Sequence, residues 1–181
     1  GAKKLLEESG WTDTDGDGYV DKDGQKLSIN WLTYPTRLEQ PKLAEYAQAT
    51  LKDIGIDVVV NNTSDHMTIA KSGDFDVYVS STTTAPTGDP EYFFTSTVTG
   101  VKNYGNYQNE EVTKLTDQLH QTFDKDERAK LAVELQQDIL DDDAFFFISH
   151  LNMGIVTKSN VTGMAAHPCD YYEITADLDV E

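Results

Sequence analysis

Apolar residues recur along the first eighty positions in patterns that switch between the helical and the extended period. Residues 2–9 predict a helix with Leu5 and Leu6 pointing inward, and it stops before Gly10 because glycine commonly ends helices. The stretch KLSINWLTY (26–34) alternates apolar and polar side chains, which predicts a strand. Together these patterns predict a short N-terminal helix and a strand, separated by a polar loop.

A second helix and two further strands follow from the same reading. Residues 41–54 have helical spacing and end before Gly55, and their inward face is expected to consist of Leu43, Tyr46, Ala47, Thr50, Leu51 and Ile54. The following IDVVVNN (56–62) is rich in β-branched residues. A strand, a helix and a strand within about 35 residues predict a right-handed βαβ unit with parallel strands. A short helix near 65–72 and a strand at FDVYVSS (75–81) are expected to extend it.

The C-terminal half predicts two amphipathic helices and two apolar strands. Asn109 is a suitable N-cap for a helix carrying Val112, Leu115, Leu119 and Phe123 on one face. Asp124 can cap a second helix with Leu131, Leu135 and Ile139 in line. AFFFISH (144–150) and MGIVTK (153–158) read as strands. The chain is therefore of the α/β class, with a mixed sheet flanked by helices.

Charge and composition narrow the classes of partner. The 181 residues have a formal net charge of −18, which disfavours nucleic acid because phosphates attract basic surfaces. One cysteine excludes an intrachain disulfide, and no apolar run approaches the ~18 residues of a membrane helix. The chain opens as GAKKLLEESGW, without Met or signal peptide, which we expect of a fragment from a longer protein.

An acidic connector at residues 12–26 resembles half of an EF-hand loop, whose ligands occupy positions 1, 3, 5, 7 and 9. Those positions are filled here by Asp13, Asp15, Asp17, Tyr19 and Asp21. The twelfth position, where an EF-hand has a bidentate glutamate, is Gly24, and a strand follows instead of a helix. The connector therefore predicts either weak calcium binding or a solvated turn with no ion.

No other motif indicates catalysis or a resident cofactor. The histidines His66, His120, His150 and His167 show no paired spacing, and His167 with Cys169 offers too few ligands for a closed metal site. The sequence has no nucleophile elbow, Walker loop, dinucleotide fingerprint or HExxH motif. We therefore expect a protein that is not an enzyme and requires no cofactor.

The segment TTTAPTGDPEYFF (82–94) is the best candidate for ligand binding. It follows a predicted strand, and α/β sheets usually bind ligands beyond the carboxyl ends of their strands. It offers threonine hydroxyls, the carboxylate of Asp89 and the ring of Tyr92. Alternatively, Asp89 and Pro90 simply begin a helix. Tyr104 either lines a pocket or packs against the loop.

Several blocks of the chain resemble, in order, the family 5 extracellular solute-binding proteins. The blocks are AKKLLEESGW with DTDGDGYVDKDGQKLSI, SGDFDVYVSS with DPEYFF, NYGNYQNEEVTKL, and GIVTKSNVTG. Members of this family are receptors for peptide and nickel ABC importers, with two lobes that close on the ligand. The resemblance implies that residues 1–181 form one C-terminal lobe, of the type II periplasmic-binding-protein fold, from a longer protein.

The resemblance also implies a ligand class, a partner and a location. The ligand would be nickel, a metal chelate or a short peptide, and it would pass to an ABC permease in the membrane. The full-length protein would be extracellular, as a lipoprotein, or periplasmic. Peptide-binding members tend to place an acid where this chain has Ala85 and Pro86, so we favour the chelate.

Ligand contacts are accordingly expected from the start of the threonine-rich segment, from three residues after it, and from the end of the first strand. These residues are Thr82, Thr83, Thr84, Ala85 and Pro86, then Asp89, Tyr92 and Tyr104, and finally Tyr34. Two other classes stay open: a calcium-stabilised structural module of a secreted surface protein, and a hydrolase fragment that uses scattered carboxylates.

Overall fold

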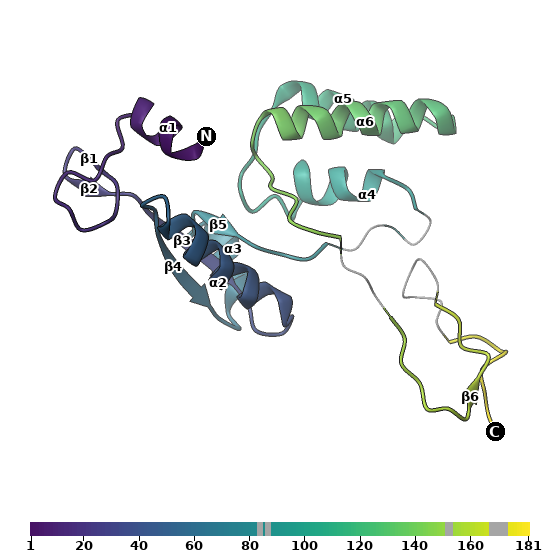
Figure 1. Cartoon of the computed structure of the whole chain (residues 1–181). Coiled ribbons are helices and arrows are strands. Elements are labelled where there is room, and N and C mark those ends of the chain that lie inside the picture. The colour runs from purple at the N-terminus through teal and green to yellow at the C-terminus, as the bar shows by residue number, and fades with distance from the viewer. Residues whose placement is uncertain (83–84, 86–87, 151–153, 167–173) are drawn as a thin grey trace. The chain divides into compact units, whose positions relative to one another are not determined.

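The chain divides into two units, Gly1–Ser81 and Thr82–Glu181, in the computed structural model drawn in Figure 1. The structure describes residues 1–82, 85, 88–150, 154–166 and 174–181. The predicted α/β class is confirmed. The prediction of a single lobe spanning 1–181 stays a prediction.

The first unit contains three helices and five strands. In chain order they are α1 (Ala2–Glu8), β1 (Asp21–Lys22), β2 (Gln25–Lys26), β3 (Ser28–Thr33), α2 (Glu39–Lys52), β4 (Asp57–Asn62), α3 (His66–Ser72) and β5 (Val77–Tyr78).

The larger sheet of this unit is parallel, with β3 between β4 and β5, while β1 and β2 form a separate antiparallel pair (Figure 1). The register of β3 and β4 runs from Ser28 opposite Asp57 to Thr33 opposite Asn62, while β5 pairs with β3 over only two residues. The predicted βαβ unit is thus confirmed. Because β3 is the central strand, its last three residues are all buried, and the predicted alternation is lost there.

The helix α2 covers the sheet with a narrower face than its sequence suggested. Ala44 is fully buried among Trp31 and Val58 of the strands. Tyr46 and Thr50 were expected to face inward, but both are exposed, Tyr46 to 71%. The face of α2 that packs on the sheet is formed by Leu43, Ala44, Ala47 and Leu51. Tyr46 and Thr50 each precede a residue of this face, so the helical period points them to solvent.

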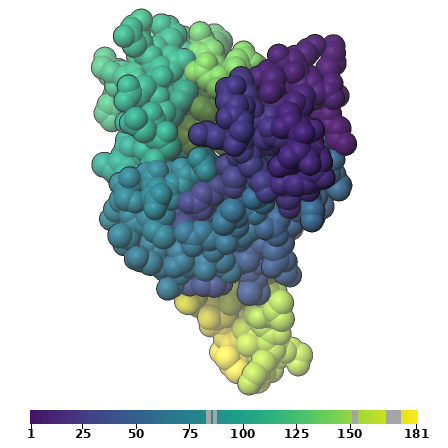
Figure 2. All heavy atoms as spheres, turned by 90° about the vertical axis from the view of Figure 1, so that its left-hand side faces the viewer, coloured from purple at the N-terminus to yellow at the C-terminus, as the bar shows by residue number. Residues whose placement is uncertain are grey.

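The acidic connector is tied to the βαβ unit at the loop after α2. The backbone amide of Val20 donates to the carbonyl of Gly55 at 2.7 Å, and Leu6 of α1 packs against the sheet core. Leu5, also expected to point inward, is exposed. Figure 2 shows these N-terminal residues, in purple, against the blue atoms of the same unit.

The second unit is mainly helical. Its elements are α4 (Glu91–Phe93), the π-helix η1 (Phe94–Val98), α5 (Glu110–Gln121), α6 (Lys125–Asp141), β6 (Val161–Thr162) and β7 (Asp179–Val180). Its core is formed by apolar side chains of η1, α5 and α6, namely Phe94, Val98, Val112, Leu115, Leu119, Leu131, Ala132, Leu135 and Ile139.

Both predicted N-caps of this unit are confirmed. The side chain of Asn109 accepts hydrogen bonds from the amides of Glu111 and Val112. The side chain of Asp124 accepts hydrogen bonds from the amides of Asp126 and Glu127. Phe123 was expected on the apolar face of α5 but is 91% exposed, because that helix ends at Gln121.

The apolar segments of the tail were wrongly predicted as strands. Residues 144–150 and 154–158 carry no strand; residue 153 lies outside the described part of the chain. Among the described residues of the tail, the strands are β6 and β7, a short antiparallel pair with Val161 opposite Val180. Apolar side chains alone do not make a strand, since each strand needs a neighbour for its backbone hydrogen bonds.

Candidate functional site

Three polar aromatic residues lie at the carboxyl edge of the parallel sheet. Tyr34 directly follows β3, His66 begins α3 after β4, and Tyr78 ends β5. Because the three strands are parallel, their carboxyl ends share one edge, which is where open α/β sheets bind ligands. We refer to Tyr34, His66 and Tyr78 as the Tyr34 cluster.

The Tyr34 cluster is held by stacking and by hydrogen bonds. The rings of Tyr34 and His66 stack with their centroids 4.1 Å apart, and the hydroxyl of Tyr78 lies 2.8 Å from Nδ1 of His66. The amide of Ser81 donates to the hydroxyl of Tyr34 at 3.4 Å. Tyr34 is only 8% exposed. The ring of His66 is therefore fixed from its face and from its Nδ1 atom.

This arrangement offers two kinds of recognition chemistry. Aromatic faces bind apolar or planar groups, while hydroxyl and imidazole groups form hydrogen bonds. An imidazole is also a common ligand of nickel and other transition metals. Tyr34 was expected as a ligand contact from its position after the strand, whereas His66 was treated as an isolated histidine. Its place four residues after β4 was the signal available in the sequence.

The threonine-rich segment is described only in part. Thr83, Thr84 and Pro86 lie outside the described residues, while Thr82 is exposed and Ala85 is half-buried. Their expected role in ligand binding therefore stays a prediction.

Asp89 is engaged by the protein itself. Its carboxylate accepts a hydrogen bond from the amide of Glu91 at 2.9 Å, which supports the predicted helix start, although the helix α4 begins one residue later than expected. Arg128 donates to both carboxylate oxygens of Asp89, at 2.7 and 2.8 Å. The hydrogen bond from Glu91, followed by the contact with Arg128, holds the pKa of Asp89 below its ordinary value.

Glu91 completes this ionic network. Its carboxylate receives a hydrogen bond from Arg128 at 2.9 Å and lies 2.5 Å from Nδ1 of His120. These two contacts, that with His120 first, lower the pKa of Glu91. The sequence did not indicate this network, because its acids and its arginine lie 37 to 39 residues apart.

The remaining expected contacts, Tyr92 and Tyr104, belong to the second unit. Tyr92 is 43% exposed, and Nζ of Lys102 lies 3.1 Å from its hydroxyl. Tyr104 is half-buried. The Tyr34 cluster belongs to the first unit, so the expected contacts fall into two groups.

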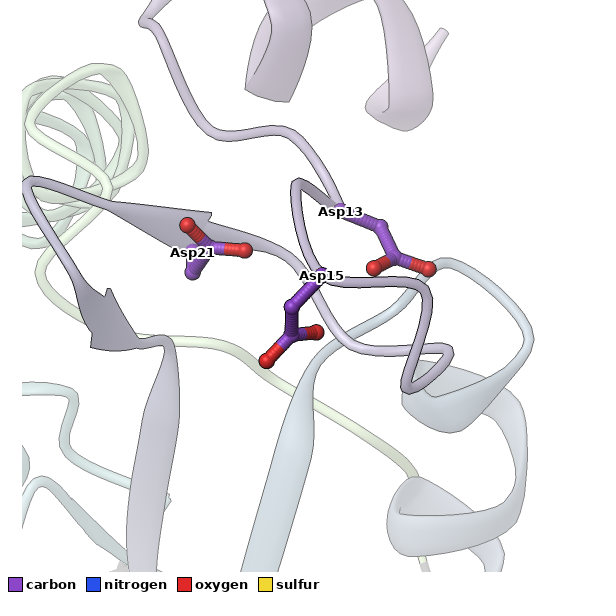
Figure 3. A group of neighbouring side chains, drawn as sticks. All are labelled: Asp13, Asp15 and Asp21. Carbon is purple, nitrogen blue, oxygen red and sulfur yellow. The ribbon is translucent and has the colours of Figure 1, made fainter.

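The acidic connector brings together three of its five expected calcium ligands. Figure 3 shows them: Asp13, Asp15 and Asp21 can each place one carboxylate oxygen within 4.8 Å of the others. Asp17 lies outside this group and pairs with Lys26 at 3.0 Å. The amide of Tyr19 donates to Asp17, and this bond, together with Lys26, lowers the pKa of Asp17. Calcium binding here stays a prediction.

The other histidines show no metal site in the described residues. His120 pairs with Glu91, and His150 is exposed. His167 and Cys169 lie outside the described part of the chain. Among the residues that the structure describes, no helix is both long and apolar enough to cross a membrane.

A parallel βαβ unit with a polar edge, joined to a helical unit, is the architecture of a type II periplasmic-binding-protein lobe, and the similar solved structures are of this class. The model of the bacterial extracellular solute-binding proteins, family 5 (middle region), matches residues 1–105. The chain belongs to this family. That membership confirms the resemblance and favours a receptor over a structural module or a hydrolase fragment.

The relatives bind different kinds of solute. The chain is 30% identical over 179 residues to the oligopeptide-binding protein AppA of Bacillus subtilis, covering 96% of this chain and 33% of AppA. It is 27% identical over 168 residues to the nickel-binding protein NikA of Staphylococcus aureus, covering 91% of this chain and 34% of NikA. The chain thus spans about a third of the length of the curated relatives it matches.

Of two similar solved structures, one holds a peptide and the other an iron chelate. AppA in complex with a nonapeptide matches 79% of this chain and 29% of AppA, with a TM-score of 0.64 and 32% identity. NikA from Brucella suis in complex with Fe(III)-EDTA matches 79% of this chain and 30% of NikA, with a TM-score of 0.67 and 25% identity.

Proposed function

We propose that this chain is the C-terminal portion of the substrate-binding component of an ABC importer. The component captures nickel as a chelate, or a short peptide, and delivers it to a membrane permease. It works outside the cytoplasmic membrane, either as a lipoprotein or in the periplasm, and it has no enzymatic activity. The chain's membership of a family of extracellular solute-binding proteins supports the solute-binding role and the location outside the cytoplasmic membrane.

The single observation that carries the proposal is the Tyr34 cluster at the carboxyl edge of the sheet. Its buried Tyr34 ring and oriented His66 ring present aromatic and polar groups where α/β proteins bind ligands. Receptors of this kind close on their ligand, so a second set of contacts would come from the rest of the longer protein.

Between the two ligands we favour the chelate. The segment before Asp89 contains no acid that could hold the amino terminus of a peptide, since Ala85 and Pro86 stand there. His66 adds an imidazole that a nickel ion could accept as a ligand. The relatives include both an oligopeptide-binding and a nickel-binding protein, so this preference rests on the residues of this chain.

Ligand extraction from the full-length receptor tests the proposal. The receptor is purified from its own host without denaturation, then unfolded, and the released material is analysed by mass spectrometry for metals, chelators and peptides. We expect nickel with a small chelator in stoichiometric amount. The matched control is a Tyr34→Ala receptor, which should release much less. Recovery of neither metal nor peptide above this control would contradict the proposed function.

A further inference from the structure

The guanidinium group of Arg128, in the first turn of α6, joins three segments of the second unit. Its Nη2 atom donates to both oxygens of Asp89 and to one oxygen of Glu91. Its Nη1 atom donates to the carbonyls of Leu119 and Thr122, at 2.7 and 2.6 Å, at the end of α5. The side chain is 15% exposed. Arg128 therefore connects the start of α4 to the corner between α5 and α6.

Both carboxylates of this network are engaged by side chains of the protein itself. Asp89 accepts from Arg128 on both oxygens, and Glu91 accepts from Arg128 on one oxygen while the other faces His120. A ligand that approached them would have to displace charge-assisted hydrogen bonds, which are among the stronger ones in proteins. The next residue, Tyr92, is 43% exposed, and its hydroxyl accepts an exposed contact from Lys102 at 3.1 Å, which a ligand displaces more easily than the paired contacts of Asp89. Of these three residues, Tyr92 is the one that can meet a ligand.

The start of α4 needs this anchor because the helix itself is short. It continues directly into η1, and the whole helical segment, Glu91–Val98, is too short to be stable by itself in water. Phe94, at the start of η1, fixes its far end by packing in the core of the second unit. At the near end, the two carboxylates would repel one another without a cation between them. Arg128 supplies that cation and fixes the near end.

We propose that Arg128 is a positioning residue for ligand binding: by holding Asp89 and Glu91, it fixes the place of Tyr92, which contacts the ligand. This inference rests on the proposed function and on the expectation, drawn from the sequence, that Tyr92 contacts the ligand. It also changes the role of Asp89, which supports the neighbouring tyrosine instead of touching the ligand.

The experiment compares Arg128→Met with Arg128→Lys and with Lys130→Met in the full-length receptor. Lys130 lies on the same helix, is exposed, and pairs with Glu127 at 3.4 Å, so its loss controls for the change of charge. Binding of two probes, nickel with L-histidine and a mixed nonapeptide pool, is measured by calorimetry. We expect Arg128→Met to weaken binding about tenfold, Arg128→Lys to restore part of it, and Lys130→Met to have no effect.

A double-mutant cycle separates positioning from general stability. Tyr92→Ala should weaken binding in the wild-type receptor but have little further effect in Arg128→Met, because the two residues act through one contact. An equal effect of Tyr92→Ala in both backgrounds would overturn the proposal. So would equal binding by Arg128→Met and Lys130→Met.

Amide hydrogen exchange of the ligand-free receptor tests the positioning role of Arg128 separately from the proposed function. In Arg128→Met and in the milder Arg128→Lys, the amides of Glu91–Phe94 should exchange faster, while those of α2 should not change. Unchanged exchange at Glu91–Phe94 in both variants would overturn the positioning role, whatever the probes show. If the wild-type receptor binds neither probe although exchange changes as expected, the proposed function fails while Arg128 is still shown to fix this turn.

Discussion

Tyr107 donates a hydrogen bond from its hydroxyl to the carboxylate of Asp142, 35 residues further along the chain. The side-chain amide of Asn109, which caps the start of α5, donates to the same carboxylate oxygen at 2.7 Å. Asp142 is the C-cap of α6. One carboxylate thus ties the start of α5 to the end of α6, and it explains how an acid is accommodated at a helix C-terminus that would otherwise disfavour it.

This pair predicts a distinctive tyrosine titration. Burial, followed by the hydrogen bond to Asp142, raises the pKa of Tyr107 from its ordinary value of 10.0 to about 12. Asp142→Asn should lower that pKa, so that one more of the nine tyrosines ionises at moderately alkaline pH. Phenolate absorbance in a pH titration measures the change, and Tyr107→Phe identifies the residue. An identical titration curve for wild type and Asp142→Asn would contradict the assignment, with Asp141→Asn as the control.

The same pair sets a pH range for the stability of the second unit. The raised pKa of Tyr107 means that its contribution is complete below pH 10.0 and is lost as the pH rises toward about 12. The pKa of Asp142 is lowered from 3.8, chiefly by the hydrogen bond from Tyr107, so its contribution is present above that pH and is lost as the pH falls further. Melting temperatures of wild type and Asp142→Asn should therefore converge at both extremes.

The sequence predicted the local features of the fold better than the contacts between residues far apart in the chain. Asn109 and Asp124 were recognisable as N-caps because a cap interacts with amides two or three residues away. The pairing of β3 with β4 followed from the strand–helix–strand order. Tyr46 was misplaced because an aromatic ring at helical spacing can lie at the margin of an apolar face and still point to solvent.

The candidate site was predicted less well than the fold, because its contacts join residues that lie far apart in the sequence. Tyr34 could be chosen from its place after a strand, but its stacking partner His66 lies in a separate element, and only the parallel sheet brings the two together. Arg128 could not be chosen at all, because nothing in the sequence near Asp89 indicates which of the basic residues reaches it.

The Tyr34 cluster predicts which variants of the full-length receptor lose ligand. Tyr34→Ala removes the ring that stacks on His66, and His66→Ala removes the imidazole, so each should weaken binding about tenfold. Tyr46→Ala is the matched control, since it deletes an exposed aromatic ring from the same unit. Calorimetry with nickel and L-histidine, and with a nonapeptide pool, gives the affinities. Unchanged binding by both cluster variants would remove the cluster from the ligand site.

The acidic connector predicts a small stabilising effect of calcium. Its three clustered carboxylates lack a bidentate glutamate, so we expect an affinity in the range of about 10⁻⁴ to 10⁻³ M that weak extracellular sites have. Millimolar calcium should raise the melting temperature of the first unit, and Asp13→Asn with Asp15→Asn should abolish that rise. Asp23→Asn removes a nearby acid outside the cluster and should keep it. A melting temperature that is the same in calcium and in chelator would exclude an ion in the connector.

Gly55 predicts a stability difference between two glycine substitutions of the first unit. Gly55 has φ = +84°, and an added Cβ atom would lie 2.9 Å from Cγ1 of Val20, whose amide donates to the Gly55 carbonyl. Gly73, at the end of α3, has φ = +76° but open space around it. Gly73→Ala should therefore cost about 1 kcal/mol, the strain of a left-handed alanine, whereas Gly55→Ala adds overpacking of about 1–3 kcal/mol.

Urea denaturation followed by tryptophan fluorescence measures this difference in the right unit. The chain has two tryptophans, Trp11 and Trp31, and both lie in the first unit, so the signal reports its unfolding alone. The midpoint for Gly55→Ala should lie clearly below that for Gly73→Ala. Equal midpoints would mean that Val20 moves aside without cost, and the connector would then be only loosely held against the βαβ unit. A lower midpoint for Gly55→Ala shows instead that the acidic connector packs against the βαβ unit, so that calcium binding in the connector changes the stability of the first unit.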